Sequence, residues 1–228
     1  DVAPSRGLGD VYKRQEFTLV DADGNHTPVH LGIPGRHNVM NALAAATVAM
    51  RYGMAPETVA RILASQHTIS PHRMALSTVN REGTSFTLID DSFNANPDSM
   101  KAGLNGLKAW NSNDGKDPFR VALLGAMLEL GADETALHTS IGTYAAELGI
   151  DAIIAVGSAQ DQHLDALAQA LADGARQSQS ASVDCVHDID AAEQLVIDLA
   201  RNHPDAVVLL KGSHASGLSA LAERWAKN

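Results

Sequence analysis

Apolar and polar residues follow two different patterns along this chain, and the change between them falls near residue 70. From residue 16 to 35, apolar and polar positions alternate on both sides of Asp23-Gly24, a pattern typical of a β-hairpin. Residues 36–53 are rich in Ala, Leu and Met and end at a glycine, which predicts a buried helix. Residues 55–65 place Val59, Ile62 and Leu63 on one face, which predicts a second helix. The sequence therefore predicts a hairpin and two helices before residue 70.

Beyond residue 70, apolar runs alternate with amphipathic segments. Strands are predicted at residues 73–80, 84–91, 119–127, 151–157, 182–188 and 205–212. Helices are predicted at residues 97–110, 133–149, 160–173, 190–202 and 216–228. The first two strands are separated by only three residues, which indicates a hairpin, whereas the later strands are apolar on both faces. We therefore expect an α/β domain with a Rossmann-like, open and mostly parallel sheet.

The first fifteen residues follow neither pattern. Residues 10–15, DVYKRQ, resemble the translation of a transposon adapter used in sequencing libraries, and a disordered arm is the alternative. We therefore expect residues 1–15 to be a non-native or disordered segment. In this interpretation residues 16–69 are the C-terminal part of one domain, and residues 70–228 form a complete second domain.

The composition narrows the possible functions. The chain has 17 Lys and Arg against 27 Asp and Glu, and its formal net charge of −10 argues against a nucleic-acid or anionic-membrane surface. The single cysteine permits no internal disulfide, and no apolar run approaches the roughly 20 residues of a membrane span. None of the ten histidines has a metal-ligand spacing, and the sequence contains no GxxxxGK[ST] or GxGxxG motif. We therefore expect a cytoplasmic protein that is not a nicotinamide dehydrogenase and has no metal site in this chain.

One strand is predicted to end in an unusually polar turn, LIDDSFNANPDSM, at residues 88–100. Asn96 is placed to cap the helix that follows. This local role leaves Asp90, Asp91 and Asn94 unexplained. A carboxylate at the end of such a strand can accept hydrogen bonds from ribose hydroxyl groups, although a turn of Asp and Asn is more often purely structural.

Three other stretches carry candidate binding groups. Asn38 and Asn41 share a face at a helix start and can read a base edge, or they are a cap and a polar core residue. Arg73 lies in the linker at SPHRM, where its guanidinium can clamp a phosphate between two domains, or it is simply solvated. Lys211 and Ser213 stand in LLKGSHASG, where backbone N–H groups at a helix start favour an anion. The glycines of this turn and of LLGAM are equally explained by steric need.

Taken together and in this order, GRHNVMNALAA, SPHRM, DDSFNANPDSM, LLGAMLELG and LLKGS resemble the Mur ligases. The resemblance runs from about Glu16 to the C-terminus. Its most specific element, DDSFNANPDSM, is similar to the branch that adds D-alanyl-D-alanine to UDP-N-acetylmuramoyl-tripeptide in peptidoglycan synthesis. The resemblance implies that residues 16–69 end the family's central ATPase domain and that residues 70–228 are its C-terminal Rossmann-like domain.

The resemblance also implies roles for single residues. Asn38 and Asn41 would lie beside the adenine of ATP, Arg73 would reach ATP, and Asp91 would hold the ribose. The dipeptide and the acyl phosphate would be contacted by Asn94, Asn96, Lys211 and Ser213.

The reaction that the resemblance implies is ATP-dependent amide ligation with magnesium. ATP phosphorylates the terminal carboxylate of the tripeptide, the amine of D-alanyl-D-alanine attacks, and the tetrahedral intermediate expels phosphate. The family's P-loop, carbamylated lysine and metal-binding Glu and His are expected upstream of Glu16. We therefore expect no catalytic residue in this chain, an inactive fragment, and a monomeric ligase.

Two positions depart from the family pattern. Ala126 stands where the family often has Asp, and His214 replaces an Arg, which exchanges a permanent charge for a titratable one. Both departures affect the substrate site more than the nucleotide site.

The alternatives to this function are another Mur-type ligase (MurE-like or folylpolyglutamate synthetase-like), a non-catalytic Mur-like binding module, or a generic Rossmann-like binder. The last is disfavoured because a fold alone would not supply all four nucleotide candidates.

Overall fold

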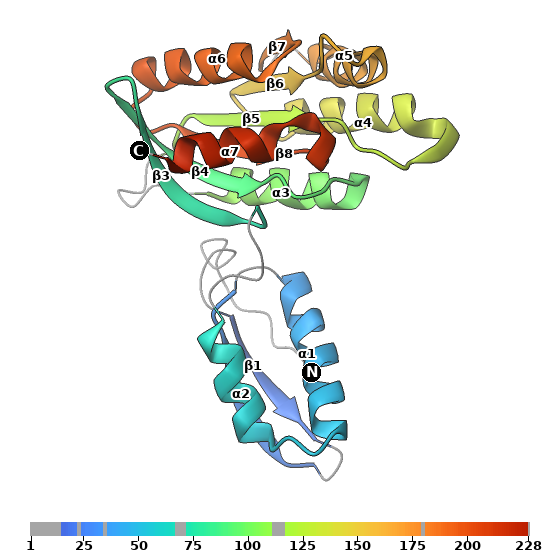
Figure 1. Cartoon of the computed structure of the whole chain (residues 1–228), viewed down its shortest axis with the longest axis vertical. Coiled ribbons are helices and arrows are strands. Elements are labelled where there is room, and N and C mark those ends of the chain that lie inside the picture. Colours follow the sequence, from blue (N-terminus) through green and yellow to red (C-terminus); the bar gives the residue numbers. More distant parts are fainter. Residues whose placement is uncertain are drawn as a thin grey trace. The chain divides into compact units, whose positions relative to one another are not determined.

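The computed structural model in Figure 1 describes residues 15–21, 24–33, 36–66, 72–110, 117–178 and 181–227. The chain divides into two compact units, Asp1–Ser70 and Pro71–Asn228, and each is described by itself. The expected non-native segment at residues 1–15 lies outside the described residues, except for Gln15 at the start of the first strand.

The first unit combines a β-hairpin with two helices. Strand β1 (Gln15–Val20) pairs antiparallel with β2 (His26–Leu31). Helices α1 (Arg36–Arg51) and α2 (Pro56–Ser65) follow. Their apolar faces and the hairpin share a small core of Leu19, Val29, Ala46 and Val59. The hairpin and both helices that the sequence predicts are therefore confirmed.

The second unit is built on a six-stranded sheet with the order β3-β4-β8-β5-β6-β7. Its strands are β3 (Ala75–Arg81), β4 (Thr84–Asp91), β5 (Arg120–Gly125), β6 (Ala152–Val156), β7 (Ser182–Val186) and β8 (Val207–Lys211). β3 is antiparallel to β4, and all other neighbouring strands are parallel. The expected α/β fold with an open, mostly parallel sheet is confirmed.

Helices cover both faces of this sheet (Figure 1). On one face, α6 (Ile189–Asn202) and α7 (Leu218–Ala226) pack against alternate strand residues such as Val121 and Leu123. The other face is covered by α3 (Pro97–Ala109), α4 (Glu134–Glu147) and α5 (Gln162–Arg176), which pack side by side. Because successive residues of a strand face opposite sides, β5, β6 and β8 are buried along their whole length.

The carboxyl ends of β4, β8 and β5 meet at one edge of the sheet. The parallel register places Lys211 of β8 opposite Asp91 of β4 and Leu124 of β5. The helices that follow β4 and β5 lie on one face, whereas α7, which follows β8, lies on the other. The helices that follow neighbouring strands therefore change from one face of the sheet to the other at β8, which makes this position a topological switch point. Ligands of open α/β sheets bind at such a point.

Candidate functional site

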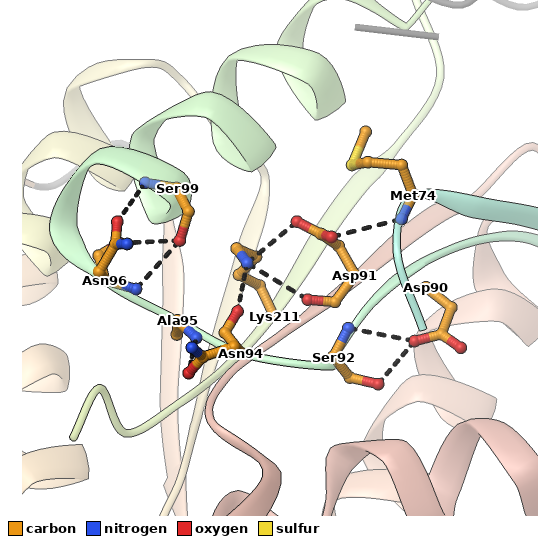
Figure 2. Close-up of polar contacts among 9 residues, drawn as sticks. All are labelled: Met74, Asp90, Asp91, Ser92, Asn94, Ala95, Asn96, Ser99 and Lys211. Atoms are coloured by element: carbon orange, nitrogen blue, oxygen red, sulfur yellow. Dashed lines mark hydrogen bonds and ion pairs between the residues drawn. The ribbon is translucent and has the colours of Figure 1, made fainter. Parts of the chain in front are cut away.

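The ammonium of Lys211 lies between Asp91 and Asn94, at the turn that follows β4 (Figure 2). Its Nζ lies 3.0 Å from Oδ2 of Asp91 and donates to the carbonyl oxygens of Asn94 (2.6 Å) and Asp91 (3.3 Å). The Lys211 side chain is 3% exposed and that of Asp91 is 17% exposed, so the ion pair is largely shielded from water. An ammonium has three donors, and here all three have oxygen partners in the turn. Lys211 is thus an internal support of this turn, and its expected contact with substrate stays a prediction.

The carboxylate of Asp91 is held from two sides. Oδ2 faces Lys211, and Oδ1 accepts a hydrogen bond from the N–H of Met74 at 3.3 Å. Burial raises the pKa of Asp91, while the charge and hydrogen bond of Lys211 act in the opposite direction. Each carboxylate oxygen can accept a further hydrogen bond, so Asp91 is a fixed acceptor that can still bind hydroxyl groups.

Asp90 has a different role from its neighbour. Its Oδ1 accepts hydrogen bonds from Oγ (2.6 Å) and N–H (3.2 Å) of Ser92 (Figure 2). Its Oδ2 lies 2.8 Å from Nδ1 of His72, whose Nε2 lies 3.5 Å from a carboxylate oxygen of Glu223. Asp90 therefore organises the turn, and for this residue the structural interpretation of the polar strand end is correct.

Arg73 lies just before β3, with its guanidinium over the ring of Phe93. The guanidinium carbon is 4.2 Å from the ring centroid, a cation–π distance, and both side chains are exposed. The ring thus supports an exposed cation whose hydrogen-bond donors have no partner among the residues that the structure describes.

The backbone on either side of Arg73 is strained. His72 has a φ of 62° and Met74 a φ of 50°, and each such left-handed residue costs on the order of 1 kcal/mol when it is not glycine. The N–H of Phe93 donates to the carbonyl oxygen of His72 at 3.0 Å, which adds to the contacts of His72 and Met74 with the two aspartates. The structure therefore brings Arg73 and Asp91 together at one strand end.

Asn96 caps α3, as the sequence predicts. Its Oδ1 accepts from the N–H of Ser99 at 2.8 Å, and Oγ of Ser99 accepts from the N–H of Asn96 at 3.0 Å, which completes a capping box (Figure 2). Oδ1 of Asn94 accepts from the N–H of Ala95 at 2.8 Å. Both Asn side chains are exposed, and their contacts with substrate stay predictions.

The turns after β5 and β8 pack back to back. A Cβ on Gly125 would collide with the side chain of Ser216, and a Cβ on Gly212 would lie 2.6 Å from Oγ of the same serine. Close approach therefore explains both glycines, which favours the steric interpretation of these turns. Ala126, where the family often has Asp, is 1% exposed and packs against α5.

The hydroxyl of Ser213 is buried between these turns and has no hydrogen-bond partner in the part of the chain that the structure describes. The backbone of Ser213 is well held, because its N–H donates to the carbonyl oxygen of Ala126 at 2.9 Å and its carbonyl oxygen accepts from Oγ of Ser216 at 2.6 Å. A buried hydroxyl without a partner costs about 1–3 kcal/mol. His214 is exposed, and its Nδ1 lies 3.2 Å from Oγ of Ser219.

Asn38 and Asn41 lie in the first two turns of α1. The helix begins at Arg36, so Asn38 is not its cap, and Asn41 is exposed, so it is not a core residue. Both structural alternatives for this pair are therefore wrong. Nδ2 of Asn41 donates to Oδ1 of Asn38 at 3.3 Å, so the two carboxamides do share a face. Their contact with a base stays a prediction.

Three residues that contact the candidate site do not stand out in the sequence. His72 contacts Asp90, Phe93 lies under Arg73, and His138 accepts a hydrogen bond from the N–H of Met127 after β5. His138 is wholly buried on α4. Its only sequence signal is its spacing from Ile141, Gly142 and Ala145, which places it on the buried face of the helix. Among the residues described, no three His, Cys, Asp or Glu side chains cluster as metal ligands. None of the helices described is long and apolar enough to span a membrane.

Comparisons with known proteins identify the family of this chain. The family model described as "Mur ligase, glutamate ligase domain" matches residues 72–214. The UDP-N-acetylmuramoyl-tripeptide--D-alanyl-D-alanine ligase of Mycobacterium tuberculosis is 39% identical over 220 residues, which cover 94% of this chain and 42% of that protein. The enzyme of the same name from Escherichia coli is 35% identical over 142 residues, 62% of this chain and 29% of that protein.

A crystal structure of MurF from Acinetobacter baumannii matches with a TM-score of 0.77 and 26% identity, over 96% of this chain and 44% of that chain. This chain thus spans less than half the length of the relatives that it matches.

Proposed function

The chain belongs to the Mur ligase family, as its motifs indicate, and on this basis we propose that it is part of an ATP-dependent UDP-N-acetylmuramoyl-tripeptide--D-alanyl-D-alanine ligase of peptidoglycan synthesis. The shared name of the relatives at 39% and 35% identity supports this branch of the family. In the proposed reaction, ATP phosphorylates the terminal carboxylate of the tripeptide. The amine of D-alanyl-D-alanine then attacks the acyl phosphate, and phosphate leaves.

The observation that carries the proposal is the way Asp91 is held at the switch point. Burying an ion pair is expensive and seldom gains stability over apolar packing, so the Asp91–Lys211 pair needs another explanation. A carboxylate fixed by Lys211 and Met74, with acceptor capacity left on both oxygens, is preorganised for the two hydroxyl groups of a ribose. We assign Asp91 to that contact.

The remaining nucleotide contacts follow from the chemistry of the other candidates. Arg73 is an exposed guanidinium on an aromatic support, which suits a phosphate group. Asn41 is exposed and bonded to the buried Asn38 on the same helix face, and its remaining carboxamide oxygen and N–H suit an adenine edge. We propose that magnesium accompanies the ATP phosphates and offsets their charge.

On the substrate side, we assign Ser213 to a contact with the dipeptide or the acyl phosphate, because its buried hydroxyl is without a partner among the described residues. Asn94 and Asn96 are exposed at the start of α3 and are assigned to the dipeptide. Lys211 contributes by holding the turn that carries Asp91 and Asn94. The ligase would act as a monomer in the cytoplasm, where ATP is supplied.

A substrate screen of a full-length ligase that carries this chain tests the branch. Phosphate release should require ATP, magnesium, the UDP-linked tripeptide and D-alanyl-D-alanine together. In the controls, the tripeptide and D-alanyl-D-alanine are both replaced. One control supplies a UDP-linked dipeptide and a diamino acid, and the other supplies a folate and glutamate. Release with either control pair would assign the chain to a different ligase of the family, and release with none would support a non-catalytic binding module.

A substitution tests the nucleotide site in the same protein. Asp91→Asn keeps the size of the side chain but weakens its acceptor, and the KM for ATP should rise about 5- to 150-fold, which corresponds to about 1–3 kcal/mol. Asp98→Asn, an exposed carboxylate on the first turn of α3, is the matched control and should leave this KM unchanged. An unchanged KM in Asp91→Asn would return Asp91 to a purely structural role.

A further inference from the structure

The peptide unit between Ala126 and Met127, directly after β5, is held from both sides. Its carbonyl oxygen accepts a hydrogen bond from the N–H of Ser213 at 2.9 Å. Its N–H donates to Nε2 of His138 at 2.8 Å. Ala126 is 1% exposed and Met127 is 0% exposed, so water is no ready substitute for either partner. One peptide unit therefore connects His138 on α4 with the turn that follows β8.

The contacts of His138 require a neutral imidazole. Nδ1 lies 2.7 Å from the carbonyl oxygen of Glu134, which can only accept, so Nδ1 carries the proton. Nε2 accepts from Met127 and therefore carries none. A second proton would place an N–H of the imidazolium against the N–H of Met127, and two donors cannot bond to each other.

The surroundings of His138 favour this neutral form. Burial lowers the pKa of His138; the backbone carbonyl and carboxylate of Glu134 act against this shift, and the charge of His163 on α5 adds to it. His163 and Glu134 form an ion pair at 3.3 Å, which partly cancels their separate effects. The other carboxylates of this loop, Glu129 and Asp133, are exposed.

We propose that His138 is a positioning residue, which in its neutral form holds the Lys211–Ser213 turn in place through the peptide between Ala126 and Met127. The inference rests on the proposed function in one respect, namely that Ser213 belongs to the substrate side. When His138 is protonated, this peptide loses its acceptor and must move, and its carbonyl oxygen then leaves the N–H of Ser213. The tight packing of Gly125 and Gly212 on Ser216 transmits the shift from one turn to the other.

The test uses the 228-residue chain labelled with ¹⁵N. Imidazole shifts give the tautomer and titration of His138, and amide exchange gives protection factors for Met127 and Ser213 between pH 8 and pH 5. We expect the Nδ1–H tautomer at pH 8 and a loss of protection at both amides, about tenfold for one hydrogen bond, that follows the titration of His138. The amide of Val208, in the centre of the sheet, is the reference that should not change.

Two substitutions separate position from charge. In His138→Gln the carboxamide oxygen can occupy the place of Nε2 without titrating, so protection at Met127 and Ser213 should persist and lose its pH dependence. In His138→Asn the side chain ends near the place of Nδ1 and cannot reach Met127, so both amides should be poorly protected already at pH 8. Wild-type protection of Ser213 in His138→Asn, or amides that ignore the titration of His138 in the wild type, would overturn the proposal. If His138→Asn does not fold, the wild-type titration decides.

Kinetics in a full-length ligase that carries this chain separate this proposal from the proposed function. His138→Asn should raise the KM for D-alanyl-D-alanine about tenfold at pH 8, with a smaller effect on kcat, and His138→Gln should not. If the amides respond as expected and neither this KM nor kcat changes, the positioning role is supported and the assignment of Ser213 to the dipeptide or the acyl phosphate is wrong.

Discussion

Lys211 and Asp91 stand directly opposite each other in the parallel pairing of β8 and β4, with Nζ of the lysine 3.0 Å from Oδ2 of the aspartate. Residues paired in this way point to the same face of a sheet, so the register itself brings the two charges together. Gly103 of α3 covers the pair, and a Cβ at this position would lie 3.3 Å from Cδ of Lys211. Asp91, the candidate ribose-binding residue, and the turn at residues 211–213 are therefore parts of one structural unit.

Removing one member of this pair should be costly. In Lys211→Met the carboxylate of Asp91 stays largely buried without its counter-charge, and the free energy of unfolding should fall by about 3–5 kcal/mol. The double variant Lys211→Met/Asp91→Asn should recover part of this loss, because no unpaired charge remains. Urea unfolding followed by tryptophan fluorescence measures the second unit alone, since Trp110 and Trp225 are the only tryptophans of the chain. Equal stability of the single and double variants would show that the unpaired charge of Asp91 is not the cause of the loss.

The ring beneath Arg73 should matter for ATP binding. Phe93→Leu removes the cation–π contact, worth about 0.5–1 kcal/mol at an exposed site, and should raise the KM for ATP about two- to fivefold in a full-length ligase. Arg73→Ala should raise it further, because the charge itself is lost. Phe93→Tyr keeps the ring and should restore the low KM. A normal KM in Phe93→Leu together with a raised one in Arg73→Ala would leave the charge important and the ring dispensable.

The close packing of the two turns predicts that Gly125 cannot carry a side chain. Gly125→Ala should lower the free energy of unfolding by about 1–3 kcal/mol, because its Cβ would overlap the side chain of Ser216. Ser216→Gly removes the obstacle, so adding Gly125→Ala to it should cost much less than in the wild type. Urea unfolding of the four proteins completes the cycle, and equal costs in both backgrounds would contradict the steric explanation.

The neutral His138 predicts a specific pH dependence of stability. Its pKa is lowered in the folded chain, so between the folded value and the unfolded value of about 6.5 the unfolded state binds more protons. Its contribution is therefore fully present above pH 6.5 and is lost as the pH falls through the folded pKa. His187 has the opposite slope, because its hydrogen bond to Asp165 raises its pKa. The free energy of unfolding is measured against pH for the wild type and His138→Gln, and the difference between the two curves isolates the contribution of His138. A difference that does not change with pH would contradict this prediction.

Much of the fold could be predicted from local patterns. A strand buried on both faces needs an uninterrupted apolar run, so β5, β6 and β8 are visible in the sequence as such runs. The cap of α3 is equally local, because Asn96 and the Ser99 amide that it binds are three residues apart. The order of the polar motifs was sufficient to identify the family, since it does not depend on how the strands are arranged.

The sequence by itself thus determined the order of the helices and strands, their boundaries to within a few residues, and the candidate polar groups. Only the tertiary structure decided which of these groups meet. The last strand inserts between β4 and β5, and no local pattern specifies this, because apolar strands of similar composition can pair in many orders. This insertion makes Lys211 the partner of Asp91 across 120 residues of chain. It also brings Ser213 to the peptide that His138 holds. Contacts of this kind depend on strand order and register, which arise from the packing of the whole sheet rather than from neighbouring residues.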